Sequence, residues 1–329
     1  MPGSAPSTAS VPDVTPDTPS PAWRAVLALL RRLPQAGLSR SLGRLADTPL
    51  PRFARTPVLS TFARAFGIDV SEAERPLREY PSVNAFFVRR LRPGARPQPD
   101  APGMTSPVDG IVGQVGRIAS GRLIQAKGRT YAAADLLGNE GEAERFEGGW
   151  FVTLYLSPRH YHRIHAPADG KIALARYVPG ALLPVNDPAV RHVEDLFARN
   201  ERLLAHLDGA FGRVSVIAVG AYNVGRISAA FDGAWSGEGA PRGERGRPGA
   251  GGKSGGARNA PTWVTNRADA LPRERRYAPS LPIRRGDEIM AFHLGSTVVL
   301  LTEPGSLLLE ARCAAGAEVR VGDLLARPE

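Results

Sequence analysis

The sequence predicts an α+β fold in which N-terminal helices lie on a largely antiparallel β body. Apolar residues recur at helical spacing between Trp23 and Leu91, whereas the apolar runs that follow Asp109 are short and interrupted by Gly, Pro or Asp. The chain holds 30 Pro and 36 Gly among 329 residues, which favours short elements and many turns over long helices. Because 43% of the residues are hydrophobic, the chain can bury a sizeable core.

The first part of the chain, residues 1–22, is expected to be a disordered tail. It combines Pro, Ser and Thr with Asp13 and Asp17 and holds no Lys or Arg. It also lacks the basic start and the apolar centre of a signal peptide. No stretch of the sequence approaches the roughly 20 apolar residues that a membrane-spanning helix needs.

Residues 23–92 are predicted to form a helical, membrane-associating region. The first helix covers Trp23–Leu33, with five apolar side chains on one face, three arginines outside that face, and Pro34 at its end. A second helix is indicated by the spacing of Leu38, Leu42 and Leu45, and a third is expected over Pro57–Phe66 and stops at Gly67. Ser71 and Glu74 have the spacing of a capping box, and Ser82 is expected to cap a helix over Val83–Leu91. Packing on the globular body is the alternative for each of these helices.

Residues 93–329 are predicted to form a β-rich domain. Leu196–Leu207 is expected to be helical, and residues 238–260 to be a flexible basic loop, since Gly alternates there with Arg and Lys. The Gly252-Lys253-Ser254 step of this loop is not interpreted as a nucleotide site, because no strand precedes it. The expected strands are Ile111–Ile118, Arg122–Ala126, Phe151–Leu156, Lys171–Tyr177, Val214–Val219, Asn223–Ser228 and a long β-rich run over Glu288–Leu301.

Charge and cysteine content indicate what kind of partner and what kind of compartment suit the protein. The formal net charge of +10 favours an anionic partner, and because no nucleic-acid motif accompanies it, an anionic membrane surface is expected and nucleic acid is not. The lone Cys313 excludes a disulfide framework and fits a reducing compartment.

Three segments far apart in the sequence supply a serine, a carboxylate and histidines. Gly295-Ser296-Thr297 lies between two apolar runs, Asp109 ends the turn Ser106-Pro-Val-Asp109, and His162 and His165 follow the apolar run at Tyr155. A Ser, His and Asp far apart in sequence can meet in a fold. No Gly-x-Ser-x-Gly motif surrounds Ser296, which argues against an ordinary serine hydrolase and favours a serine that attacks its own backbone.

In these segments the chain resembles the bacterial phosphatidylserine decarboxylase family, whose proenzymes cut themselves and use a pyruvoyl group. The resemblance runs from roughly Leu50 to the C-terminus. Further matching stretches are Ser82-Val-Asn-Ala-Phe-Phe-Val-Arg-Arg-Leu91, Gln125-Ala-Lys-Gly128, Tyr177-Val-Pro-Gly180, Val185-Asn186 and Leu196-Phe-Ala-Arg-Asn-Glu-Arg202.

The resemblance implies self-cleavage between Gly295 and Ser296 by a triad of Asp109, His165 and Ser296. Ser296 would become the covalent pyruvoyl cofactor that forms a Schiff base with the substrate, and His162 would be the proton donor. Residues 1–295 would become the β chain and residues 296–329 the α chain, which stay associated, and a higher oligomer is left open. The implied reaction converts phosphatidylserine to phosphatidylethanolamine in phospholipid biosynthesis, at the cytoplasmic side of the cell membrane, as a peripheral protein.

Several alternatives stay open on the sequence. His160, His162 and His165 could be metal ligands, but only the first two share a strand face and no Cys or Glu completes the set, so no metal is expected. Lys127 and Arg163 are candidates for holding the lipid phosphate. A pyruvoyl enzyme for another amino-acid substrate and an uncleaved membrane-binding scaffold are the rival functions. His160 stands where the family has an acid, and His293 has no assigned role.

Overall fold

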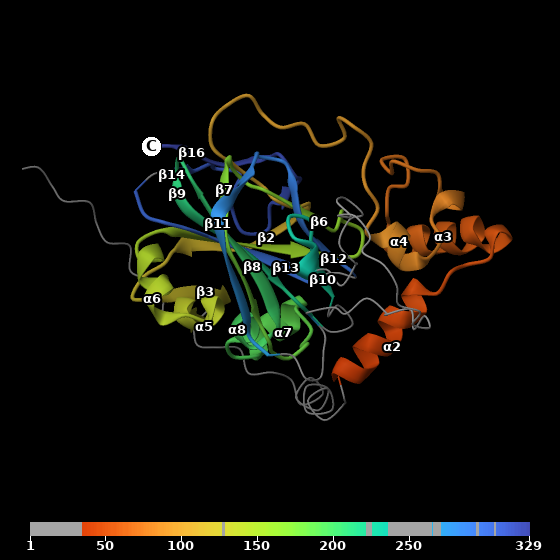
Figure 1. Cartoon of the computed structure of the whole chain (residues 1–329), viewed down its shortest axis with the longest axis horizontal. Helices are drawn as coiled ribbons and strands as arrows, with labels where there is room; N and C mark the ends of the chain where they lie inside the picture. The colour runs from red at the N-terminus through yellow and green to blue at the C-terminus, as the bar shows by residue number, and fades with distance from the viewer. Residues whose placement is uncertain are drawn as a thin grey trace, which may run out of the picture.

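The computed structural model describes residues 35–126, 129–221, 226–235, 265, 271–293, 296–305 and 307–329 (Figure 1). Three helices, α2 to α4, lie together on one side of a body built mainly of strands (Figure 1). The predicted α+β class, with N-terminal helices and a largely antiparallel β body, is confirmed. The tail 1–22, the predicted helix Trp23–Leu33 and the loop 238–260 lie outside the described residues.

The N-terminal helices are α2 (Gln35–Asp47), α3 (Arg52–Phe66) and α4 (Val83–Phe87), with the 3₁₀ turn η1 (Leu77–Glu79) between the last two. Gly67 ends α3 in the left-handed region, with φ of 67°, as its sequence position predicts. The start predicted at Pro57 is wrong, because α3 begins at Arg52 and holds Pro57 inside it. Ser82 caps α4 as expected, and its Oγ accepts the N–H of Ala85 at 3.1 Å.

The other two helical expectations in this region are wrong for one reason. The chain after Phe87 is extended, and Leu91 forms a β-bridge with Ala73. The N–H of Glu74 donates to the carbonyl of Arg90 at 2.9 Å, so both segments use their backbone groups for pairing. Helix α4 therefore stops before Leu91, and no capping box forms between Ser71 and Glu74.

An eight-stranded antiparallel sheet, in the order β11-β7-β8-β9-β13-β5-β2-β15, forms the centre of the body. Its strands are β2 (Gly110–Arg117), β5 (Trp150–Leu156), β7 (Gly170–Val178), β8 (Arg202–Gly209), β9 (Gly212–Val219), β11 (Arg273–Ile283), β13 (Ser296–Thr302) and β15 (Glu318–Val319). Smaller sheets join β1 (Met104–Thr105), β16 (Leu324–Pro328) and β14 (Leu307–Leu309), then β10 (Ile227–Ala229), β12 (Glu288–Phe292) and β6 (Arg163–His165), then β3 (Arg122–Ala126) and β4 (Arg129–Ala132).

One expectation in the body is corrected by this topology. Leu196–Leu207 is not one helix, because α8 (Leu196–Arg199) ends at Arg199 and strand β8 begins at Arg202. The two apolar runs within Glu288–Leu301 form two strands, β12 and β13, and these belong to different sheets.

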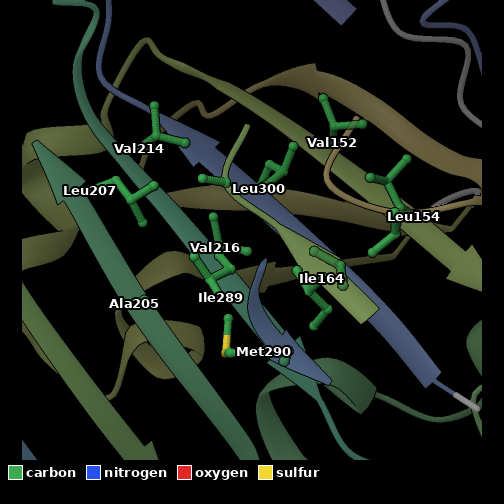
Figure 2. Close-up of a cluster of buried hydrophobic side chains, with 14 of the residues drawn as sticks. Val152, Leu154, Ile164, Ala205, Leu207, Val214, Val216, Ile289, Met290 and Leu300 are labelled. Carbon is green, nitrogen blue, oxygen red and sulfur yellow. The ribbon is translucent and has the colours of Figure 1, made fainter. Parts of the chain in front are cut away.

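The sheet carries a hydrophobic core on each face. Val298 and Leu300 of β13 pack on the side of the small β10-β12-β6 sheet (Figure 2), whereas Val299 and Leu301 pack on the opposite side. This second side is covered by α5 (Ala133–Leu137), α6 (Glu140–Ala143), η2 (Glu144–Phe146), α7 (Asp187–His192) and α8. Strand β13 is therefore buried on both faces, and its first residue lies between the two layers. In the part of the chain that the structure describes, no helix is long and apolar enough to cross a bilayer.

Candidate active site

Ser296 is the first residue of β13 and lies in the middle of the large sheet. It pairs with Leu156 of β5, and the next residue, Thr297, pairs with both Tyr155 and Val219. The Ser296 side chain is buried, and its hydroxyl has no hydrogen-bond partner among the described residues. Gly295, on the other side of the predicted cleavage point, lies outside the described residues.

Asp109 immediately precedes β2 and is also buried. Because Ile111 and Thr297 both pair with Tyr155, the starts of β2 and β13 are two strand spacings apart, about 10 Å. Both carboxylate oxygens of Asp109 accept hydrogen bonds from Arg96, whose Nε lies 2.9 Å from Oδ1 and 3.1 Å from Oδ2. The backbone N–H of Val321 donates to the same Oδ1 at 2.9 Å, so this carboxylate is firmly held.

His165 lies on β6, beside the turn that holds Asp109. Its backbone N–H donates to the carbonyl of Pro107 at 2.8 Å. Its Nδ1 donates to the carbonyl of Gly286 at 2.6 Å, and the Tyr161 hydroxyl lies 3.3 Å from Nε2. Burial lowers the pKa of His165, and the bond to Gly286 and the negative charge of Glu288 oppose this more than the charge of Asp109 does. The ring is therefore a neutral imidazole with its lone pair on Nε2.

The structure brings the three predicted triad residues into one region without joining them. Asp109 is bonded to Arg96 and Val321, and His165 to Gly286 and Tyr161. Within the described residues, no hydrogen bond connects His165 with Asp109 or with Ser296. The predicted triad stays a prediction about the chemistry of the cleavage.

His162 lies next to the segment that leads to Ser296. Its carbonyl accepts the N–H of Phe292 at 2.9 Å, four residues before Ser296. Its Nδ1 donates to the carbonyl of His160 at 2.8 Å, and its ring packs on Phe87 with centroids 4.0 Å apart. Burial lowers the pKa of His162 to about 3, and its Nε2 is buried without a partner in the described chain.

His162 and Ser296 belong to the same layer of the molecule. Residues two apart in a strand share a face, so Ser296 lies on the face of β13 that presents Val298, and His162 on the face that presents Ile164. Val298, Leu300 and Ile164 belong to one core cluster, and Figure 2 shows Ile164 and Leu300 among its side chains. His165 is on the other face of β6, where it lines a cavity of about 510 Å³ with Tyr161 and Glu288. The structure thus places two unsatisfied buried atoms, Ser296 Oγ and His162 Nε2, in one layer.

Comparison with known proteins identifies the kind of site. A sequence profile described as phosphatidylserine decarboxylase matches residues 83–327. The chain belongs to the phosphatidylserine decarboxylase family. The predicted enzyme class, a carboxy-lyase, is thereby confirmed.

Curated relatives in this family match nearly the whole chain. A phosphatidylserine decarboxylase proenzyme of Anaeromyxobacter sp. (strain K) is 44% identical over 305 residues, which cover 92% of this chain and 98% of the relative. Proenzymes of the same name from Myxococcus xanthus (strain DK1622) and Brevibacillus brevis (strain 47) are 37% and 36% identical, over 90% and 91% of this chain and 95% and 96% of theirs.

His293, which had no assigned role, joins the N-terminal helices to the decarboxylase body just before the predicted cleavage point. Asn84 of α4 donates to its Nδ1 at 3.1 Å, and its Nε2 donates to the Ser228 hydroxyl at 3.1 Å. Asn84 also donates to Asp47 of α2 at 2.7 Å. Burial lowers the pKa of His293 to about 3, so it is neutral in this arrangement. The family stretch that begins at Ser82 contains Asn84, but nothing in the sequence points to its partner.

His160 has a local role in the turn after β5. Its Nδ1 accepts the N–H of Ser157 at 3.0 Å, and its Nε2 is 3.7 Å from the Glu318 carboxylate. Burial lowers the pKa of His160. Within the described residues, no group of three or more His, Cys, Asp or Glu side chains is arranged to hold a metal ion.

A large cavity opens on the other face of the sheet, directly beside the predicted cleavage point. Its volume is about 920 Å³, and Thr297 contributes to its wall. Tyr155 of β5 and Asn186 at the start of α7 also line it. This volume falls within the range of small-molecule sites, about 300–1,000 Å³.

Proposed function

We propose that this chain decarboxylates phosphatidylserine to phosphatidylethanolamine, with a pyruvoyl group that it makes from Ser296 by cutting itself after Gly295. The observation that carries the proposal is the hydroxyl of Ser296, buried in a central strand without a partner. A buried polar group left unsatisfied costs about 1–3 kcal/mol. Ser215 shares this property, and Ser296 differs from it by lying at the Gly295-Ser296 step where the family resemblance places the cut. The word "proenzyme" in the names of the relatives supports the same conclusion.

The proposed cleavage balances without an external oxidant or reductant. The Ser296 oxygen attacks the carbonyl carbon of Gly295, its proton passes to a base, and the amide becomes an ester. Removal of the Cα proton of residue 296 then breaks the Cβ–O bond, leaving Gly295 with a free carboxylate and residue 296 as dehydroalanine. Tautomerisation and hydrolysis by one water release ammonia and leave the pyruvoyl group. Glycine before the serine suits the unusual backbone geometry that such an attack requires.

We assign the base of the cleavage to His165, with Asp109 stabilising the positive charge that the ring acquires. The ring is neutral, its Nδ1 is fixed on Gly286, and the turn of Asp109 adjoins its backbone. His162 is the competing base, because its free Nε2 lies in the layer of Ser296. Separate variants of the two histidines distinguish these roles.

In the decarboxylation, the pyruvoyl group would supply a carbonyl that can condense with the substrate amine and an electron sink for the electrons that CO₂ leaves behind. His162 handles the proton that replaces CO₂. Its bond to the His160 carbonyl fixes the ring, and its free Nε2 is the atom that takes up and delivers the proton. Because burial opposes a charged ring, a proton held there is readily given up.

The two chains would stay together after the cut because of the position of β13. This strand opens the α chain and pairs with β5 on one side and β9 on the other, both from the β chain. The α chain also contributes β16, which pairs with β1. Cleavage therefore removes one covalent bond and leaves these ladders in place.

We further propose that the protein binds the cytoplasmic surface of the membrane peripherally through its N-terminal region. Several large apolar side chains of this region are exposed, with Leu45 at 69% and Phe53 at 85%. The net charge of +10 favours an anionic surface. The lipid would enter the site from this side, and the cavity beside Thr297 offers room for part of it.

The test is a decarboxylation assay on phosphatidylserine in mixed micelles, with product identified as phosphatidylethanolamine. Wild type should turn over, and Ser296→Ala should be inactive and uncut. Ser215→Ala is the matched control, because Ser215 is also a buried strand serine whose hydroxyl lacks a partner in the described chain. It should cut itself and turn over normally. A cut wild type that leaves phosphatidylserine untouched would overturn the substrate assignment and favour another amino-acid substrate.

A further inference from the structure

Arg89 is a buried cation for which the described chain supplies no hydrogen-bond acceptor. It follows α4 and is only 3% exposed. Its Nε and Nη1 are buried without any hydrogen-bond partner among the described residues, and the guanidinium lies 5.4 Å from the centre of the Phe86 ring. A buried charge without a paired acceptor is costly, so an anion that completes this site would be bound favourably.

The neighbouring arginines do not share this property. Arg96 is bonded to Asp109 and Glu72, and Arg159 to Glu318. Arg163, a candidate phosphate ligand on sequence grounds, donates to the carbonyl of Val88 and to Glu288. Lys127, the other candidate, lies outside the described residues. Among these arginines, Arg89 is the one whose buried donors have no acceptor in the described chain.

Arg89 also lines a small polar cavity of about 140 Å³. Arg96, Arg159 and Arg320 also line it, with His160 and the carboxylates of Asp69, Glu72, Asp109 and Glu318. Each of these carboxylates already accepts a hydrogen bond or ion pair from a residue of the chain. At roughly 30 Å³ per water molecule, the cavity has room for one small oxyanion and not for an acyl chain.

We propose that Arg89 binds the phosphate group of the lipid substrate at this cavity. The inference rests on the proposed function, which does not say which residue contacts the phosphate of the lipid headgroup. Arg89 adjoins the proposed chemistry, because Phe87, two residues earlier, packs on His162. The serine carboxylate of the lipid is the less suitable partner, since an ion pair that holds it in the ground state would oppose its loss as CO₂.

Steady-state kinetics on the self-cleaved enzyme test the proposal. With phosphatidylserine in mixed micelles, Arg89→Met should raise KM by about 10- to 100-fold, the loss expected for a charge-assisted hydrogen bond. The KM of Arg89→Lys should lie between those of wild type and Arg89→Met, since lysine keeps the positive charge but lacks the planar pair of donors of a guanidinium. Arg90→Met is the matched control, because Arg90 is adjacent and largely exposed, and its KM should not change. An unchanged KM in Arg89→Met, with wild type active, would overturn the inference and leave the proposed function standing; an inactive wild type would remove the proposed function itself.

Two further measurements separate a binding role from a structural one. Inhibition by sn-glycerol 3-phosphate should be lost in Arg89→Met, whereas inhibition by free serine should persist; the reverse pattern would mean that Arg89 holds the carboxylate and would overturn the proposal. Self-cleavage and Tm of Arg89→Met should match wild type, because Met replaces an unpaired buried charge with similar volume. If Arg89→Met does not fold, Arg89→Lys decides alone: weakened glycerol phosphate inhibition supports the proposal, and unchanged inhibition contradicts it.

Discussion

At the scale of single residues, burial sets the chemistry of the histidines. It lowers the pKa of both His162 and His165, and backbone carbonyls fix the Nδ1–H of each ring. Both rings are therefore neutral near pH 7 and hold a lone pair on Nε2. Only that of His162 is without a partner in the described chain.

The roles of the two histidines are separable by substitution. His165→Ala should stay uncut or nearly so, whereas His162→Ala should cut itself and then decarboxylate at least about 10²-fold more slowly, the usual loss for a positioned acid or base. Gel electrophoresis of the purified variants and turnover on phosphatidylserine check both halves. Failure of His162→Ala to cut itself, together with full cleavage of His165→Ala, would make His162 the base.

Self-cleavage should have a pH dependence set by the lowered pKa of His165. A base must be neutral to accept a proton, and the neutral form predominates above its pKa. Because burial moves that pKa below the usual value of 6.5, the cleavage rate should be retained at pH 8 and fall with a midpoint below pH 6.5. Newly synthesised precursor from cell-free expression, shifted to each pH and followed on gels, gives the rate. A midpoint at or above pH 6.5 would contradict the buried neutral base.

Sequence motifs located Ser296, Asp109 and the histidines, since residue type and order survive without a structure. They could not supply the partners. Arg96 holds Asp109 and Gly286 holds His165, and each lies in a segment with no chemical signature of its own. Arg89 was visible only as one of two adjacent arginines, and its missing acceptor is a property of the packing.

At the scale of elements, the sequence predicted the buried strands β5 and β9 from their short apolar runs but mistook β8 for part of a helix. Strand β8 is buried on six successive residues, so its apolar run has no period of two and resembles a helix. Strand β11, which was not foreseen, has the opposite character. It is a largely exposed edge strand rich in arginine and carries Pro279 and Pro282, which an edge tolerates.

The membrane binding that we propose for the N-terminal helices can be tested at their exposed apolar side chains. Replacing exposed Leu45 and Phe53 with Glu should release the protein from anionic vesicles at high salt, since each large apolar side chain contributes up to roughly 1.5–3 kcal/mol. Leu271→Glu is the matched control on the body, because Leu271 is 78% exposed. Co-sedimentation measures binding, and self-cleavage should be unaffected in all variants. The same test applies to the predicted helix Trp23–Leu33 through Leu27→Glu with Leu30→Glu.

Either double variant that still pellets with lipid like wild type would assign its helix to the protein's own packing. Loss of binding in Leu271→Glu would place the membrane contact on the β body instead. Retention of binding in both double variants, or its loss in Leu271→Glu, would contradict a membrane-facing N-terminal region.

At the scale of the whole molecule, the central position of β13 connects fold and function. The predicted cut precedes a strand that is paired on both sides and buried on both faces. The new chain end would thus be held rigidly between a core layer that contains His162 and a cavity beside Thr297. The sequence predicted the two apolar runs around the serine, but not that they belong to different sheets, because sheet assignment depends on partners far away in the chain.

The intact mass of the purified protein tests the central claim most directly. Self-cleavage predicts two chains, residues 1–295 with a free C-terminal Gly295 and residues 296–329 with a pyruvoyl group in place of the N-terminal serine. Ser296→Ala should give one chain of the full mass. A wild-type protein that stays as one chain of 329 residues while it decarboxylates phosphatidylserine would contradict the account, as would a small chain that begins with an intact serine.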